Sequence, residues 1–454
     1  MISPATALID QAPGRSSKPW ARAASAAFLL MVCLLPWMKH GFTLGGLEVV
    51  PSDLIFLVVM ALWLAALAAG EMRLRFHPAF VLLALYFAAM AASLIVSADP
   101  RASAFKLLTQ LYLLALPVMA FNFVETRAQA KKLILCWIAA ATLVGAYGAA
   151  TVLLFPLFGY DSFLREPLHN FGTLPPGFYP RIELTFEYPA MLANYLGVSL
   201  MLLLVAGAQG WVRRTTGAAA AGLMLLSAFF ALTPGFGGIL AMLFIWVWYR
   251  QRARHPRLAG FALLAAIGSI ASEVLVAAVT PFLHPSAPFL IHVPGIATPL
   301  APAVRLMVWT AAVHNFLASP LIGHGIGIDP VNVLFQPREG SKAFYVTDAH
   351  NLALGLAVQC GLLGLAALGA IVAVGIRQAR AAAAQCQKNL LLFGLSIAWL
   401  SGLAIEGLVG SFEDARHLWV LFGLMLAAAR LGGNARACGA QPLADGAAET
   451  SHSH

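Results

Sequence analysis

Charged residues are scarce in this chain of 454 residues, in which Asp, Glu, Lys and Arg together make up 10% and hydrophobic residues make up 60%. A typical soluble domain carries about 25% charged residues. The mean hydropathy is +0.82. A chain this apolar cannot cover its surface with polar groups, so the soluble classes are excluded and an integral membrane protein is expected.

Cysteine is also rare, with five residues in the chain. Cys33, Cys136 and Cys360 lie within apolar runs, and Cys386 and Cys438 are expected to face the cytoplasm. There is no CxxC pair, which excludes a disulfide framework and a cysteine metal or redox site, and no metal or cofactor is expected. The net charge of +9 comes without a basic patch interleaved with aromatic residues, so no nucleic acid partner is expected.

Long apolar runs, most of them long enough to span a bilayer as helices, recur along the whole length. The sequence therefore predicts an all-α polytopic membrane protein with about twelve membrane-spanning helices. The eighth and twelfth runs are short, so the expected range is eleven to thirteen. The runs are 22–38, 54–70, 79–97, 104–124, 132–156, 189–207, 215–232, 236–250, 258–282, 351–375, 388–410 and 416–431.

The positions of Lys and Arg predict the orientation, because cytoplasmic loops carry an excess of these residues. With the N-terminus inside, nineteen of the 28 lie on the cytoplasmic side. The predicted organisation is a cytoplasmic tail at 1–21, nine spans within 22–282 with an outer loop at 157–188, a large periplasmic loop at 283–350, three spans within 351–431, and a disordered cytoplasmic tail at 432–454. The first span is expected to act as a signal anchor.

The large outer loop contains a stretch with helical periodicity, 303–318 (AVRLMVWTAAVHNFLA). Apolar residues fall on one face, whereas Arg305 and Trp309, four residues apart, lie together on another. This pattern predicts an amphipathic helix at the membrane surface. The stretch SPLIGHGIG at 319–327 follows, and its three glycines allow a tight bend or a close approach to a ligand.

Four stretches resemble the bacterial O-antigen ligases and O-antigen polymerases. They are RLMVW at 305–309, SPLIGHGIG at 319–327, AHNLALGLAVQCGLLGL at 349–365 and PRIELTFEYPAMLANYL at 180–196. The two strong motifs, RLMVW followed by SPLIGHGIG and then AHNLALGLAVQCGLLGL, cover roughly residues 303–374. The resemblance does not separate the branches of this superfamily.

The resemblance implies a metal-independent, inverting glycosyltransferase of the GT-C type in the bacterial inner membrane, with its active site facing the periplasm. The donor would be a glycan on undecaprenyl pyrophosphate. The acceptor would be lipid A–core for a ligase of lipopolysaccharide biosynthesis, or a growing chain for an O-antigen or exopolysaccharide polymerase. A protein hydroxyl would be the acceptor in a glycosylating branch.

One departure from the family pattern concerns a turn that commonly reads T-x-S-R-G. The corresponding stretch here is LTPGFGG, with Phe236 where the arginine would stand. One phosphate contact is therefore missing, and Arg181 is a candidate to replace it.

His350 is the candidate catalytic base. Thr347 or Asp348 is expected to cap the helix that follows, which would leave His350 in its first turn. The positive end of the helix dipole would there disfavour a protonated ring, so the neutral ring could accept a proton from an acceptor hydroxyl. The alternative is a surface histidine bonded to loop carbonyls.

Arg305 is the second candidate catalytic residue, because a guanidinium matches phosphate oxygens and its permanent charge can stabilise a leaving pyrophosphate. The alternative is an interfacial anchor beside Trp309. For each further candidate, the alternative is a structural or solvated residue without a role in substrate binding. The candidate substrate-binding residues are Arg181, Glu187, Tyr188, His314, Asn351 and Trp309.

Glu273 and Glu406 lie within predicted spans, where carboxylates are functional suspects. Glu273 is expected to be protonated or paired, and Glu406 to reach the interface. A competing function is a secondary transporter, which twelve helices and a deep Glu273 would fit, although no repeat between halves is visible. The glycines of the tenth run, Gly361 and Gly369 among them, are expected to be close-packing positions.

Overall fold

The computed structural model describes residues 18–39, 41–44, 47–169, 180–280, 301–302, 304–335, 344–385 and 389–437. Thirteen α-helices and three short antiparallel strand pairs lie in these residues, so the predicted all-α class is confirmed. Most of both predicted tails, residues 170–179 of the first outer loop, and residues 281–300 and 336–343 of the large loop fall outside the described residues. Expectations for those stretches stay predictions.

Every predicted apolar run coincides with a helix. Eight helical runs are long and apolar enough to cross a membrane, and α1 and α7 are shorter apolar helices, so the multi-pass prediction is confirmed. The helices are α1 (Pro19–Leu34), α2 (Pro51–Ala68), α3 (Ala79–Ser93), α4 (Pro100–Phe123), α5 (Arg127–Phe158), α6 (Pro189–Ala208), α7 (Arg214–Phe230), α8 (Phe236–Gln251), α9 (Pro256–Ala278), α11 (Leu352–Ala384), α12 (Leu390–Leu400, continued by the π-helix η3, Ser401–Ile405, and the 3₁₀ turn η4, Glu406–Leu408) and α13 (Arg416–Ala437).

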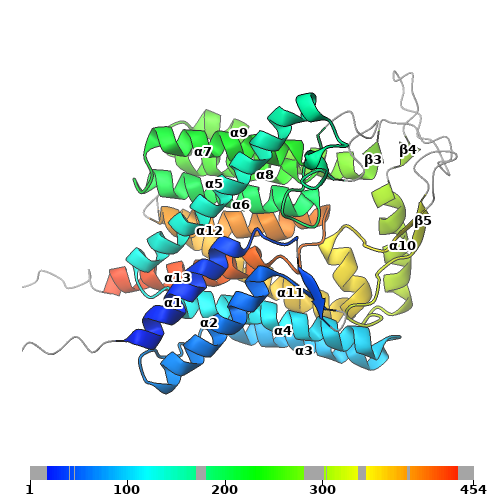
Figure 1. Cartoon of the computed structure of the whole chain (residues 1–454), viewed down its shortest axis with the longest axis horizontal. Coiled ribbons are helices and arrows are strands. Elements are labelled where there is room, and N and C mark those ends of the chain that lie inside the picture. The colour runs from blue at the N-terminus through cyan, green and yellow to red at the C-terminus, as the bar shows by residue number, and fades with distance from the viewer. Residues whose placement is uncertain are drawn as a thin grey trace, which may run out of the picture.

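The thirteenth helix, α10 (Val304–Ala318), runs across one end of the bundle (Figure 1). It coincides with the amphipathic helix predicted at 303–318. Val308 and Ala312 on its apolar face are fully buried. We call this end of the bundle the α10 end. The strand pairs are β1 (Phe42–Leu44) with β2 (Leu47–Val49), β3 (Val279–Thr280) with β4 (Ala301–Pro302), and β5 (Val333–Phe335) with β6 (Phe344–Val346).

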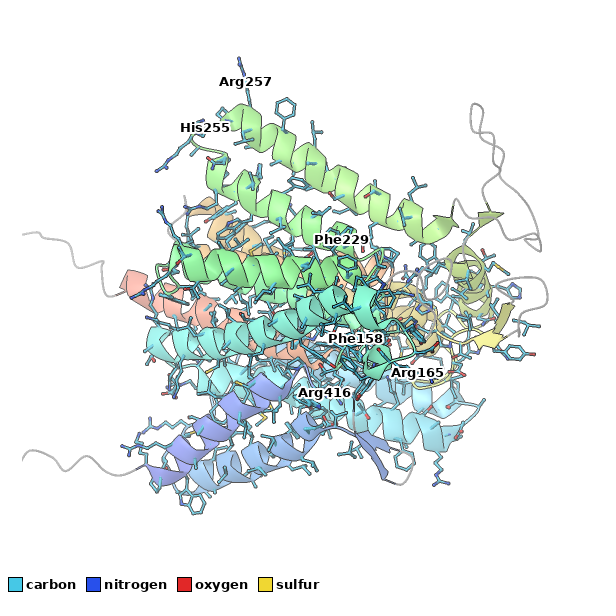
Figure 2. All side chains as sticks on the ribbon, turned by 45° about the horizontal axis from the view of Figure 1, so that its top comes forward. Phe158, Arg165, Phe229, His255, Arg257 and Arg416 are labelled. Carbon is cyan, nitrogen blue, oxygen red and sulfur yellow. The ribbon has the colours of Figure 1, made fainter. Side chains whose placement is uncertain are left out.

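The start of α1 and the end of α13 lie together at the opposite end of the bundle (Figure 1). His255 and Arg257, between α8 and α9, lie toward this same end, whereas Arg165 lies toward the α10 end (Figure 2). This agrees with the orientation that the distribution of basic residues predicts.

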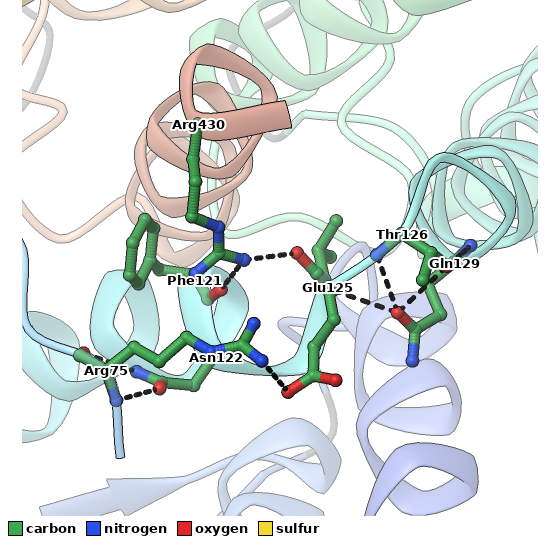
Figure 3. A network of polar contacts seen from close by, with 8 residues as sticks. Arg75, Phe121, Asn122, Glu125, Thr126, Gln129 and Arg430 are labelled. Atoms are coloured by element: carbon green, nitrogen blue, oxygen red, sulfur yellow. Dashed lines mark hydrogen bonds and ion pairs between the residues drawn. The ribbon is translucent and has the colours of Figure 1, made fainter. Parts of the chain in front are cut away.

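A network of basic side chains ties helix ends together where α4 and α13 meet (Figure 3). Arg430 donates to the backbone carbonyls of Phe121 (3.2 Å) and Val124 (2.7 Å), and its guanidinium lies 4.2 Å from the centre of the Phe121 ring. Arg75 pairs with Glu125 at 3.0 Å. The last carbonyls of α4 are therefore satisfied by cations, which suits the negative end of a helix dipole.

Helix α11 is broken at Gly361, which has a φ of 61° and a ψ of −158°. The SPLIGHGIG stretch at 319–327, here called the inserted loop, packs into the break. Helical hydrogen bonds lost at the break are replaced by backbone bonds to this loop, as membrane-embedded backbone requires. His324 and Gly325 donate to the carbonyls of Val358 (2.9 Å) and Gln359 (3.0 Å), and Leu362 and Leu363 donate to those of Pro320 (2.8 Å) and Leu321 (3.2 Å).

Two glycines make this junction possible. Gly323 and Gly361 both have positive φ. A Cβ atom on Gly323 would lie 2.4 Å from the backbone of Gln359, and one on Gly361 would lie 2.4 Å from the backbone of Leu321. The expected close packing of Gly361 is thus observed, together with a break in the helix that the sequence did not reveal. The expectation for Gly369 is wrong, because a Cβ there would meet nothing within 4 Å.

We predict that Gly323→Ala and Gly361→Ala each destabilise the fold, by roughly 1–3 kcal/mol from backbone conformation alone and by more from the clash. The midpoint of thermal unfolding in detergent should fall for both variants. Gly369→Ala, on the same helix, is the matched control and should leave the midpoint unchanged. Equal midpoints for all three variants would contradict the junction.

Candidate functional site

His350 lies immediately before α11, outside the helix. Asn351 is the N-cap, since its Oδ1 accepts from the Leu354 N–H at 2.9 Å, and its Nδ2 donates to the Leu408 carbonyl at 2.8 Å. The prediction that Thr347 or Asp348 caps the helix, with His350 in the first turn, is therefore wrong. Asparagine has the same capping chemistry, and the cap stands after the histidine rather than before it.

His350 has a φ of 47°, a conformation that costs energy for a residue with a side chain. Its ring Nδ1 lies 3.0 Å from Oδ2 of Asp348, and its backbone N–H donates to Oδ1 at 3.1 Å. Of the two side chains, 38% of the His350 surface and 46% of the Asp348 surface remain exposed. The acidic partner, rather than a helix dipole, thus orients the imidazole.

Asp348 is held as an anion. Burial alone would raise the pKa of its carboxyl, but hydrogen bonds from His350 and from Ser411 outweigh burial and hold the pKa at about 2. The Ser411 hydroxyl donates to Oδ1 at 2.7 Å. An anionic Asp348 favours the tautomer in which Nδ1 of His350 carries the proton, which leaves Nε2 free to accept one.

Arg305 lies in the first turn of α10. Its Nε atom is enclosed and has no hydrogen-bond partner within the described part of the chain. Burial and, next, the positive charge of Arg181 hold the pKa of the Arg305 guanidinium down at about 10, against the opposing charges of Asp348 and Glu273. Arg181, Asp348 and Glu273 therefore lie within electrostatic range of Arg305, although these four residues come from four separate segments.

Trp309 packs against the buried cluster that contains Val308 and Ala312, and its Nε1 also lacks a partner among the described residues. His314, farther along α10, is exposed. The structure thus places Trp309 against a buried apolar cluster and leaves His314 on the surface.

Arg181 lies beside the turn at 232–238, where the family pattern has its arginine. Its Nε donates to the carbonyl of Ala231 at 3.3 Å. Burial lowers the pKa of the guanidinium, and Glu183 opposes that shift. The ring of Phe236 instead packs edge-on against Phe229, with their centres 5.7 Å apart. A guanidinium is therefore present beside the turn, although it is that of Arg181, from the loop before α6, and not that of a residue within the turn.

Glu183 is a feature that the sequence analysis missed. It accepts from Lys39 Nζ at 2.7 Å and lies 2.5 Å from Nδ1 of His169. Burial would raise the pKa of Glu183, but bonds from His169 and Lys39 lower it overall. In the sequence, Glu183 is marked only by its place two residues after Arg181. Its partners, Lys39 and His169, could not be predicted because they lie in other segments of the chain.

Tyr188 and Glu187 stand at the start of α6. The Tyr188 hydroxyl donates to the carbonyl of Ser411 at 3.0 Å, so α6 is tied to the segment that also contacts Asp348. Glu187 is exposed and lines a cavity described below. Arg416 forms a bidentate pair with Asp53, at 2.9 and 3.0 Å, so its guanidinium is bound within the protein.

Two cavities, of about 590 and 320 Å³, open beside Asp348. Thr109, Asp348, Ser411 and Glu413 line both of them. Cavities of about 300–1,000 Å³ are typical of small-molecule sites. The arrangement therefore offers room for a ligand next to an Asp–His pair.

Glu273 and Glu406 are both buried, with 2% and 1% of their surfaces exposed. The expectation that Glu406 reaches the interface is wrong, because the π-helix η3 turns it inward, where its Cγ would lie 2.6 Å from a Cβ on Gly238. Both carboxyl oxygens of Glu273 and Oε2 of Glu406 have no hydrogen-bond partner in the described ranges. Such groups are expensive to bury and mark functional regions.

A family model described as O-antigen ligase matches residues 219–369, about a third of the chain. This stretch contains the turn at 232–238, α10, the inserted loop and His350, whereas Arg181 lies before it. The match supports similarity to the O-antigen ligase-like superfamily, and with it a glycosyltransferase-like activity of the ligase or polymerase type on lipid-linked glycans. No curated protein matches the chain.

We predict that Arg305→Met raises the free energy of unfolding by roughly 1–2 kcal/mol, because it removes a buried cation whose charged form the fold disfavours. The lowered pKa fixes the sign, since a cation with a depressed pKa is less stable in the folded protein than in water. Thermal unfolding in detergent is the measurement. Arg416→Met is the control and should lower the midpoint, because it strands Asp53. A lower midpoint for Arg305→Met would show that Arg305 is well paired.

Proposed function

We propose that this protein transfers a glycan from undecaprenyl pyrophosphate to an acceptor hydroxyl at the periplasmic face of the bacterial inner membrane. Lipid A–core is the proposed acceptor, which makes the protein an O-antigen ligase of lipopolysaccharide biosynthesis. The observation that carries the proposal is the position of Arg305, which lies within electrostatic range of Arg181 and of Asp348, the partner of His350, at the α10 end.

The proposed reaction is a single displacement with inversion. The acceptor oxygen attacks the anomeric carbon of the donor sugar, and the bond from that carbon to the pyrophosphate oxygen breaks. The acceptor proton passes to Nε2 of His350, and the electron pair of the broken bond leaves with the pyrophosphate. Asp348 holds the ring and stabilises the imidazolium that forms.

Arg305 and Arg181 neutralise the charge that grows on the departing pyrophosphate. A guanidinium keeps its charge at neutral pH and binds phosphate oxygens in a bidentate manner. Burial without a bonded partner leaves Arg305 Nε available for such an oxygen. Because fixed charges supply the stabilisation, the proposed mechanism needs no metal.

A polymerase of the same superfamily is the closest alternative, because the matching family description and the motifs do not separate the branches. The size ladder of lipopolysaccharide from a deletion strain distinguishes them. Loss of all polymer from lipid A–core indicates the ligase, and a single repeat unit left on the core indicates the polymerase. Loss of exopolysaccharide with normal lipopolysaccharide indicates an exopolysaccharide polymerase.

A secondary transporter is supported by a different observation, the buried carboxyl groups of Glu273 and Glu406. Ion-coupled uptake that Glu273→Gln abolishes would favour that function over glycan transfer.

We predict that His350→Ala lowers glycan transfer by at least about 100-fold, since it removes the general base. Asp348→Asn should lower transfer by a smaller factor, because the ring remains but loses its orienting anion. Complementation of a deletion strain, with expression checked by immunoblot, is the measurement. His255→Ala, at the opposite end of the bundle, is the matched control. Normal attachment of glycan by His350→Ala would exclude the mechanism.

We predict that Arg181→Ala weakens the interaction with the donor and raises its KM by roughly tenfold, as loss of one charge-assisted contact to phosphate would do. Arg181→Lys should recover only part of the loss, because a lysine lacks the planar fork. Arg257→Ala is the control. A donor KM that does not change in Arg181→Ala would exclude a phosphate contact by this residue.

A further inference from the structure

The two cavities beside Asp348 form a region with its own charge pattern. The larger one also contacts the N-terminus of α4 and the stretch 327–330, and the smaller one contacts the start of α6. Their shared lining consists of Thr109, Asp348, Ser411 and Glu413. All four of these side chains carry oxygen atoms that can accept a hydrogen bond from an alcohol, and none is a cation.

The nearby cations are already paired. Lys106 forms a short ion pair with Asp414, and Arg416 is held by Asp53 in two bonds. Arg101, at the rim, is exposed, and its guanidinium lies 5.8 Å from the centre of the Phe105 ring. Among the described residues, a phosphate entering these cavities would therefore meet carboxylates and cations that are already paired, whereas the enclosed Nε of Arg305 has no partner on the proposed donor side.

Glu413 stands out within this lining. It lies in the segment between η4 and α13, and its Oε2 atom is enclosed without a hydrogen-bond partner in the part of the chain that the structure describes. Burial and then the charge of Asp414 raise the pKa of Glu413 to about 7, and Lys106 opposes the shift. A carboxyl group near its neutral form can both accept and donate hydrogen bonds.

We infer that these cavities are the acceptor subsite and bind the terminal sugar of an uncharged, hydroxyl-rich glycan, with Glu413 Oε2 bonded to one of its hydroxyls. Phe105 supplies an apolar surface for the CH face of the ring. Asp348 lines the subsite and also holds His350, so the bound sugar lies next to the base. This assignment rests on the proposed function and adds where the acceptor binds.

The experiment uses the full-length protein in detergent and two probes. One probe is core oligosaccharide freed of lipid A and of phosphate, and the other is undecaprenyl pyrophosphate without glycan. Dissociation constants of Glu413→Gln, Arg305→Ala and the wild type are compared. Asp161→Asn, an exposed carboxylate that lines neither cavity, is the matched control.

Glu413→Gln should weaken binding of the core oligosaccharide by about tenfold and change binding of undecaprenyl pyrophosphate by less than about twofold. Arg305→Ala should show the reverse. If Glu413→Gln fails to fold, Thr109→Trp fills the same cavities and should abolish binding of the oligosaccharide alone.

Unchanged oligosaccharide binding by Glu413→Gln overturns the assignment, as does an equal loss of both probes. Wild-type protein that binds undecaprenyl pyrophosphate but not the oligosaccharide overturns the subsite and leaves the donor side of the function intact. Wild-type protein that binds neither probe overturns the proposed function itself, and the subsite with it.

Discussion

The backbone bonds between the inserted loop and the broken helix α11 hold the candidate site in place. α10, which carries Arg305, leads directly into this loop, and α11 begins two residues after His350. Farther along the loop, the N–H of Ile326 donates to Ser93 Oγ at 2.9 Å, and that of Gly327 to Gln359 Oε1 at 2.9 Å. Each freed backbone group would cost several kcal/mol in hydrocarbon, so the two segments can only be stable together. The candidate base, His350, and the candidate phosphate-binding residue, Arg305, are thereby held in a fixed relation to one another.

Around this rigid junction, several groups violate the rules that govern the rest of the core. Arg305, Glu273 and Glu413 are enclosed with atoms that lack partners among the described residues, and His350 adopts a left-handed backbone. Proteins usually satisfy buried polar groups and avoid such conformations. These departures around the junction mark a region where binding is more important than stability.

The local signals in the sequence predicted much of this structure. Hydrophobic runs located twelve of the helices, and the spacing of Val308 and Ala312 located α10, because both signals depend on neighbours within one helix. The break at Gly361 was not predictable, since its cause is a loop forty residues earlier. The N-cap was misplaced by three or four residues for a related reason: Asn351 is anchored from outside the helix by the Leu408 carbonyl. Glu183 was missed because Lys39 and His169 reach it from distant segments.

The segment 408–411 is a joint shared by three parts of the molecule. Asn351 bonds to its first carbonyl, Tyr188 bonds to its last, and the Ser411 hydroxyl bonds to Asp348. A displacement of this segment is therefore transmitted to the imidazole of His350 through the carboxylate of Asp348. Ser411 of this segment also lines both cavities, so a ligand bound there would change the orientation of the His350 ring. The ring would then be oriented for proton transfer only when an acceptor is bound, and water alone would not react.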